Sequence, residues 1–313
     1  MTDHLDRRPL VSIIIPSFNQ GRYIRETIDS CLQQDYRPIE ILVMDGGSRD
    51  DTVSVLQSIK APELTWVSEP DGGVVDAVNK GLRRSTGAIL TIQSSDDVFL
   101  PGALSAMVAA FSKKPALGLV YGDVELIDEH SQLIGVDEHP PFDLAEYLGR
   151  FQYIPQPGTC FTRRAFDQAG EWRDTVSYAA DADLWMRIAA KFPVTNISRR
   201  VGRYRYHDEQ RDTQKSRIAR DWQGAVTDLI QSGLLDARQR RFARMGLHLA
   251  RYRYAPESAW VTRTSALYAA AMCNPMAVTN RHFPKWELVP GRTPIWAFLS
   301  GIKRRLGVQT RGS

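Results

Sequence analysis

The first 121 residues alternate short apolar runs with segments of helical periodicity. Residues 10–15 are apolar and β-branched and stop at Pro16, which is typical of a buried parallel strand. In residues 21–34 apolar side chains recur at helical spacing, which predicts a helix. The alternation continues with predicted strands at 39–44, 64–67, 88–92 and 117–121 and predicted helices at 50–60, 76–84 and 101–112. This order predicts an α/β fold, Rossmann-like, with a mostly parallel sheet flanked by helices on both faces.

Beyond residue 124 the pattern is weaker. We expect helices at 142–153 and 180–188, a segment of strand character from 156–161 onward, and a final strand at 201–206. Residues 217–274 are rich in Ala, Leu, Arg and Gln and are predicted to be helical, with breaks at Gly233 and Gly246. We therefore divide the chain into an α/β domain over 1–210 and a basic, mainly helical C-terminal extension over 211–313.

Polar residues follow successive predicted strands, and this is the main functional signal in the chain. In sheets of this kind ligands bind outside the carboxyl ends of the strands. Those ends carry, in chain order, Ser17 and Asn19, Asp45 and Ser48, Asp71, and Asp96 with Asp97.

Two of these groups have a specific chemical interpretation beside a structural one. Adjacent carboxylates at Asp96 and Asp97 are hard oxygen ligands suited to Mg²⁺ or Mn²⁺, which clamps a diphosphate; the alternative is a cap for the helix after Pro101. Asp45 and the two glycines after it would suit a nucleoside, while the alternative is a tight turn with Ser48 as a helix cap. Neither a G-x-G-x-x-G fingerprint nor a Walker-type phosphate loop is present.

Charge is unevenly distributed along the chain. The 40 Lys and Arg exceed the 36 Asp and Glu by only 4. Residues 1–196 hold 18 basic and 28 acidic side chains, a net of −10, and residues 197–313 hold 22 and 8, a net of +14. The 3 cysteines fit neither a metal motif nor a disulfide framework. Without an apolar run near about 20 residues or a signal-peptide core, we expect a cytoplasmic protein that is soluble or attached to the inner face of the membrane.

Eight motifs in order along residues 9–210 resemble those of glycosyltransferase family 2. They are PSFNQ at 16–20, MDGGSRDDT at 44–52, SEPDGG at 68–73 with DAVNKG at 76–81, SSDD at 94–97, YGD at 121–123, QPGTCFTRR at 156–164, DADLWMR at 181–187 and YRYH at 204–207. The resemblance implies a fold of the GT-A type, a nucleotide-diphosphate-sugar donor, a divalent metal (Mn²⁺ or Mg²⁺) and inversion at the anomeric carbon.

The resemblance also assigns roles to individual residues. The donor nucleotide would be held by Pro16, Ser17, Phe18, Asn19, Asp45 and Ser48, with Asp71 at the edge of the pocket and Asp96 at the ribose or sugar. Asp97 would ligate the metal, His207 would reach the metal or the diphosphate, and Asp181 would be the catalytic base.

The residues near the end of the resemblance also have a structural interpretation. Asp181 is also a helix N-terminal acid favoured by the dipole, His207 is also a solvated strand-end histidine, and Asp183 is expected to be structural. The chain departs from the family at Gly46, where many relatives carry a second acid, and at Ala180, where a glutamate often precedes the base.

The basic C-terminal part suggests an acceptor and a location. Arg199, Arg200, Arg203, Arg205 and the run at 238–241 would form a face for anionic lipid or a phosphate-bearing acceptor, and residues 294–306 combine aromatic and basic side chains as interfacial segments do. The alternative is a solvated basic surface. We expect a glycan or lipid-linked acceptor in cell-surface polysaccharide synthesis and possible peripheral contact with anionic membrane.

Two other classes of protein are rivals. A pI of about 9.0 suits nucleic-acid binding, but no nucleic-acid-binding motif is apparent, and we expect no nucleic-acid partner. A sugar nucleotidyltransferase also uses strand-end carboxylates and a metal, but would be expected to carry a Gly-rich basic loop after the first strand, of which SFNQGR at 17–22 is a poor version.

Overall fold

The computed structural model describes residues 8–150, 152–207, 214–255 and 259–274. The chain forms two compact units. The first consists of Met1–Phe142 and Tyr153–Gln214, and the second of Asp143–Gln152 and Lys215–Ser313. The second unit thus takes up the segment 143–152, which a boundary at residue 210 leaves in the first domain. The aromatic and basic segment at 294–306 lies outside the described residues.

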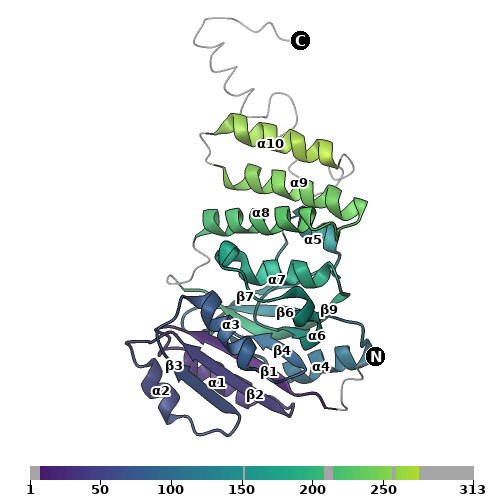
Figure 1. The fold of residues 1–313 in the computed structure, drawn as a ribbon. Coiled ribbons are helices and arrows are strands. Elements are labelled where there is room, and N and C mark those ends of the chain that lie inside the picture. The colour runs from purple at the N-terminus through teal and green to yellow at the C-terminus, as the bar shows by residue number, and fades with distance from the viewer. Residues whose placement is uncertain (1–7, 151, 208–213, 256–258, 275–313) are drawn as a thin grey trace, which may run out of the picture. The chain divides into compact units, whose positions relative to one another are not determined.

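A single mixed sheet runs through the described part of the first unit (Figure 1). Its order is β3-β2-β1-β4-β8-β6-β9-β5, and β7 pairs with β6. The strands are β1 (Val11–Ser17), β2 (Ile39–Asp45), β3 (Leu64–Ser68), β4 (Ile89–Ile92), β5 (Val98–Phe99), β6 (Leu119–Ile127), β7 (Leu133–Asp137), β8 (Thr159–Thr162) and β9 (Val194–Arg205). The half formed by β3, β2, β1 and β4 is parallel. From β8 onward the pairing is antiparallel except for β6 with β9.

Helices cover both faces of this sheet because alternate strand residues point to opposite sides. Ile13, Ile15 and Val43 belong to one core cluster with residues of α1 (Ile24–Leu32), α2 (Thr52–Ser58) and α4 (Ala103–Lys113). Leu42 and Met44 pack on the other face against α3 (Val74–Arg84). Farther along that face, Phe161 of β8 contacts α6 (Arg163–Ala169) and α7 (Ala180–Ala189), and its ring centroid lies 5.4 Å from that of Trp185.

The predicted α/β fold with helices on both faces is confirmed, and the parallel arrangement holds for the half of the sheet up to β4. The expected final strand at 201–206 is the end of a longer strand, β9. Two strands of the structure were not predicted from the sequence. β5 is only two residues long, and Leu133 and Ile134 of β7 are more than half exposed at the sheet edge, so β7 shows no buried face.

The second unit is helical. Its described helices are α5 (Leu144–Arg150), α8 (Lys215–Gln231), α9 (Ala237–Tyr254) and α10 (Trp260–Cys273), and in Figure 1 α8, α9 and α10 lie one above another. Gly233 ends α8 with a φ of +76° as predicted, but the predicted break at Gly246 is wrong, because α9 runs through it. A Cβ at Gly246 would lie 2.0 Å from the Leu148 carbonyl oxygen, so this glycine allows α5 to pack closely on α9. None of the helices in the described ranges has the length and apolar character needed to cross a membrane.

Candidate active site

A cavity of about 870 Å³ lies at the carboxyl ends of the parallel strands in the first unit. Its wall comes from the end of β1, the loops after β2, β3 and β4, the turn η1 (Asp174–Ala179) with the start of α7, and the residues just after β9. Of the predicted site residues, the lining contains Pro16, Ser17, Phe18, Asp71, Asp96, Asp97, Asp181 and His207. Asn19, Asp45 and Ser48 are not part of the lining.

Asp45 instead organises the loop that follows β2. Its side chain is buried, and Oδ2 accepts hydrogen bonds from the main-chain N–H groups of Gly47 (3.2 Å) and Ser48 (3.0 Å) and from the Ser68 hydroxyl (2.6 Å). The hydroxyl of Ser48 donates to Oδ1. Both carboxylate oxygens are therefore occupied within the protein, and the structural alternative that Asp45 builds a tight turn matches this geometry.

Asn19 and Ser48 join the loops after β1 and β2. The Asn19 N–H donates to the Ser48 hydroxyl (2.7 Å), and the Asn19 side-chain oxygen accepts from the Arg49 N–H (2.9 Å). Asn19 has a φ of +54°, a left-handed conformation that asparagine adopts more readily than most residues. This pair holds Phe18, which is 58% exposed, at the cavity wall.

Asp71 occupies the space beside Gly46. A Cβ at Gly46 would lie 2.9 Å from Asp71 Oδ2, so a larger residue there would displace this carboxylate. Asp71 Oδ1 accepts from the Gly73 N–H at 2.8 Å. The absence of a side chain at Gly46 thus leaves room in the cavity wall for the acid of the next loop.

Asp96 and Asp97 follow β4 and are held by the end of β9. Asp97 Oδ1 accepts from the Arg205 main-chain N–H at 2.9 Å, and Asp96 Oδ2 lies 2.9 Å from His207 Nε2. The His207 side chain is only 6% exposed, and its ring centroid is 5.3 Å from that of Tyr23 on the loop before α1. His207 is therefore not a solvated strand-end histidine.

Asp97 has features of a cation ligand. It is buried, and its Oδ2 has no hydrogen-bond partner in the described part of the chain. Burial and the charge of Asp96 raise the pKa of Asp97 well above its usual range. Among the described residues no three His, Cys, Asp or Glu side chains form a ready cluster for a metal. An unpaired carboxylate oxygen in a cavity fits a divalent ion that also takes oxygens from its ligand.

Further unpaired polar atoms belong to the same lining. Ser17 Oγ, Gln20 Oε1 and Trp172 Nε1 are buried, and within the described ranges none has a hydrogen-bond partner. Because an unsatisfied buried polar atom costs about 1–3 kcal/mol, a group of them around one cavity favours a binding site over a packing defect.

Asp181 and Asp183 occupy the first turn of α7 but have different surroundings. Asp181 lines the cavity, and its Oδ1 accepts from the Ala182 N–H at 2.7 Å. Asp183 is buried away from the cavity and accepts from Nε of Arg173 (3.0 Å) and Nε of Arg187 (2.9 Å). Arg187 also donates to the carbonyls of residues 169–171, so Asp183 fixes this helix to the preceding loop, in agreement with the structural role predicted for it.

Sequence reasoning missed several residues of the cavity lining, among them Trp172 and Gln20, and misplaced Arg205. Asn79 holds Trp172 there, because its side-chain amide accepts from the Trp172 N–H (3.0 Å) and donates to the Trp172 carbonyl (2.9 Å). The expectation that Arg205 belongs to an exposed basic face is wrong, because the residue is fully buried beside Asp96 and Asp97. Its position two residues before His207, within one motif, was the available signal.

The motif at 121–123 supports the sheet and does not line the cavity. Asp123 is buried, and its Oδ1 accepts from the His139 N–H (2.9 Å) and from Nδ2 of Asn196 (3.2 Å). This carboxylate thereby joins β6 to β9 and to the segment after β7.

Comparisons with known proteins agree with this architecture. The family model described as glycosyl transferase family 2 matches residues 12–171. The chondroitin synthase of Escherichia coli is 29% identical over 219 residues, which cover 69% of this chain and 32% of that protein. The chain thus spans about a third of this relative's length.

Two solved structures have the same fold at low sequence identity. The TarS 1–349 structure from S. aureus, determined in complex with UDP-GlcNAc, has a TM-score of 0.64 at 14% identity and covers 96% of this chain and 93% of its own. The mannosyltransferase PcManGT from Pyrobaculum calidifontis, in complex with GDP-Man and Mn²⁺, has a TM-score of 0.64 at 19% identity and covers 97% and 89%. These likenesses show a fold of the GT-A type. Since the family model matches more than half of the residues, the chain belongs to glycosyl transferase family 2.

Proposed function

We propose that this chain is an inverting glycosyltransferase that moves a sugar from a nucleoside-diphosphate donor to a hydroxyl group of a glycan or lipid-linked acceptor in cell-surface polysaccharide synthesis. The observation that carries the proposal is one cavity lined by Asp96 and Asp97 after β4 and by Asp181 at the start of α7. It supplies acids for the diphosphate end and for the acceptor end of a transfer reaction within one space.

The donor nucleotide is assigned to the wall formed by the ends of β1 and β3. Phe18 presents an exposed ring on which a base can stack, and the Asp71 carboxylate accepts from a base or ribose hydroxyl. Asn19, Asp45 and Ser48 support this wall through their hydrogen bonds rather than by lining it.

A divalent metal, Mn²⁺ or Mg²⁺, is assigned to Asp97, with Asp96 and His207 beside it. The unpaired Asp97 Oδ2 is the free ligand oxygen, and His207 orients Asp96 through the 2.9 Å contact. When bound, the ion would neutralise charge on the departing diphosphate.

Asp181 is the proposed base. A direct displacement inverts the anomeric carbon and needs one group that takes the proton from the attacking hydroxyl. Asp181 lines the same cavity as Asp97 and lies in the first turn of α7, so its carboxylate is the proposed acceptor of that proton.

Calorimetry tests the donor site. We expect one of UDP, dTDP, GDP and CMP to bind the wild type in a Mn²⁺-dependent manner, with binding lost in Asp97→Ala. Binding should be kept in Asp167→Ala, which removes an exposed acid outside the cavity. Product analysis then separates a transferred sugar with free nucleoside diphosphate from released pyrophosphate, which would indicate a nucleotidyltransferase. Failure of all four nucleotides to bind would refute the donor-site assignment.

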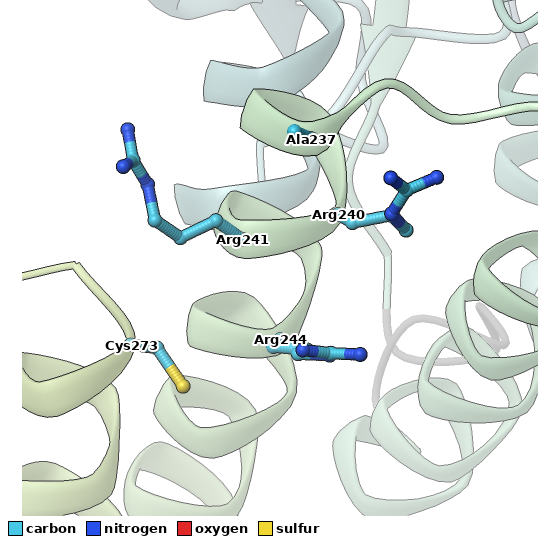
Figure 2. A pocket seen from close by; sticks show the side chains of 5 residues that line it. All are labelled: Ala237, Arg240, Arg241, Arg244 and Cys273. Atoms are coloured by element: carbon cyan, nitrogen blue, oxygen red, sulfur yellow. The ribbon is translucent and has the colours of Figure 1, made fainter.

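We further propose that the second unit makes peripheral contact with anionic lipid at the inner face of the membrane, which places the enzyme in the cytoplasm. Ala237, Arg240, Arg241, Arg244 and Cys273 surround a recess of about 290 Å³. In the described part of the chain no carboxylate pairs with these three arginines. In Figure 2 Arg240 and Arg244 extend to one side of α9 and Arg241 to the other, which suits several headgroups better than one small anion.

Sedimentation with liposomes tests this contact. The intact protein should sediment with anionic but not neutral vesicles at low salt, and Arg240→Gln/Arg241→Gln/Arg244→Gln should sediment less. Arg200 and Arg203, which the sequence also assigned to a lipid-binding face, already lie 3.8 and 3.0 Å from Glu125. Arg200→Gln/Arg203→Gln is therefore the matched control and should sediment like the wild type. If the wild type stays in the supernatant, the membrane proposal is wrong. A salt-sensitive mobility shift of a nucleic acid would then favour the nucleic-acid-binding alternative.

A further inference from the structure

Arg205 is a fully buried arginine at the end of β9. Its Nη2 donates to the Glu26 carboxylate at 2.7 Å, and its Nη1 donates to the Ser131 hydroxyl at 2.8 Å and the Asp128 carbonyl at 3.2 Å. The guanidinium carbon lies 4.7 Å from the ring centroid of Tyr23. These contacts tie the end of β9 to α1, to the loop before it and to the turn that connects β6 with β7.

The same residue also holds the acidic pair. Its main-chain N–H donates to Asp97 Oδ1 at 2.9 Å, and its side-chain Nε donates to the main-chain carbonyl of Asp96 at 2.8 Å. His207, two residues farther on, contacts the Asp96 carboxylate. One strand end therefore fixes both acids, and Asp97 Oδ2 is left as the oxygen without a partner.

Resting on the function proposed above, we propose that Arg205 is a positioning residue for the metal site. Through its side chain it fixes the main chain at residues 96 and 205, and thereby directs the free oxygen of Asp97 toward the bound cation. The metal is held by Asp97, while Arg205 determines where that oxygen lies.

If Arg205 acted only through its charge, its loss would change the Mn²⁺ affinity in the opposite direction. A guanidinium near a cation site repels the cation, so its removal alone would tighten metal binding. Loss of positioning weakens it instead, and substitutions of residues that orient metal ligands typically weaken binding by about 10–100-fold. The direction of the change therefore distinguishes the two roles.

The experiment titrates Mn²⁺ into the full chain with UDP, dTDP, GDP or CMP present and follows free Mn²⁺ by electron paramagnetic resonance. The variants are Arg205→Met, Arg205→Lys and the control Arg163→Met. Arg163 also donates to main-chain carbonyls, those of Gly87 (3.3 Å) and Ser85 (2.8 Å), but lies outside the cavity lining. The melting temperature of each variant is measured in parallel.

We expect Arg205→Met to bind Mn²⁺ at least about tenfold more weakly than the wild type, with Arg205→Lys in between. Arg163→Met should lose thermal stability and keep wild-type Mn²⁺ affinity. Unchanged or tighter Mn²⁺ binding by Arg205→Met would overturn the inference. If Arg205→Met does not fold, the Mn²⁺ affinity of Arg205→Lys is compared with that of the wild type by the same criterion. A wild type that binds no Mn²⁺ with any of the four nucleotides would instead refute the metal assignment itself, and the inference with it.

Discussion

Replacement of Asp45 by asparagine separates a residue that supports the cavity wall from one that contacts a ligand. Asp45 is 2% exposed, and Gly47, Ser48 and Ser68 all donate to Oδ2. Asparagine offers one oxygen and an NH₂ group, so at least one of these donors would face another donor. A hydrogen bond to a charged group is worth about 1.5–3 kcal/mol, and an unsatisfied buried donor costs about 1–3 kcal/mol. We therefore expect the free energy of unfolding to fall by about 2–4 kcal/mol.

Urea unfolding followed by circular dichroism measures this loss, and calorimetry on the folded variant measures nucleotide binding. Asp71→Asn is the matched control, because Asp71 lines the cavity and accepts a hydrogen bond from Gly73 N–H. It should lose less than about 1 kcal/mol of stability but bind the nucleotide about 5–30-fold more weakly. If Asp45→Asn keeps wild-type stability and loses nucleotide binding, Asp45 contacts the ligand directly and the reasoning from its hydrogen bonds is refuted.

Three further outcomes are expected. Asp183→Ala leaves the partly buried Arg187 without its carboxylate and should cost about 3–5 kcal/mol in urea unfolding, so a loss below about 1 kcal/mol would contradict the structural role. Burial raises the pKa of Cys31 and Cys160 to about 12, so at pH 8 iodoacetamide should modify Cys273 first, and peptide mass spectrometry of the native protein should not find the other two labelled. Burial acts to raise the pKa of Glu40, but hydrogen bonds from Ser12, Thr86 and Gly87 outweigh it and lower that pKa below 4.5. The stabilisation from Glu40 is present above pH 4.5 and is lost as the pH falls through the lowered pKa, so Glu40→Gln should show less acid destabilisation below that pH than the wild type.

Much of the parallel half of the fold could be predicted because its signals are local. Buried parallel strands are continuous apolar runs, and Pro16 and the polar residues after each strand mark where they stop. The placement of Asp71, Asp96 and Asp97 at one cavity follows from that alternation, since parallel strands direct their carboxyl ends to one edge.

The roles of individual side chains were harder to predict because they depend on contacts distant in sequence. Asp45 follows a strand as Asp97 does, yet three donors from its own loop and β3 occupy its Oδ2. A glycine inside a helical pattern often marks a helix break, but Gly246 is present because the Leu148 carbonyl approaches the helix closely there. Arg205 stands in a basic run, and only the fold reveals that Glu26 and Asp128 surround it.

The candidate site combines residues from the parallel and the mixed halves of the sheet, and this explains why the sequence motifs located its residues but not the contacts between them. The parallel half supplies the loop with Asp96 and Asp97, while the mixed half supplies Arg205 and His207 from the end of β9. The two pieces are more than 100 residues apart in the chain, so each motif is visible alone but the hydrogen bonds between them are not. Since the orientation of Asp97 depends on both halves, a perturbation at the end of β9 should affect metal binding even where it leaves the acids unchanged.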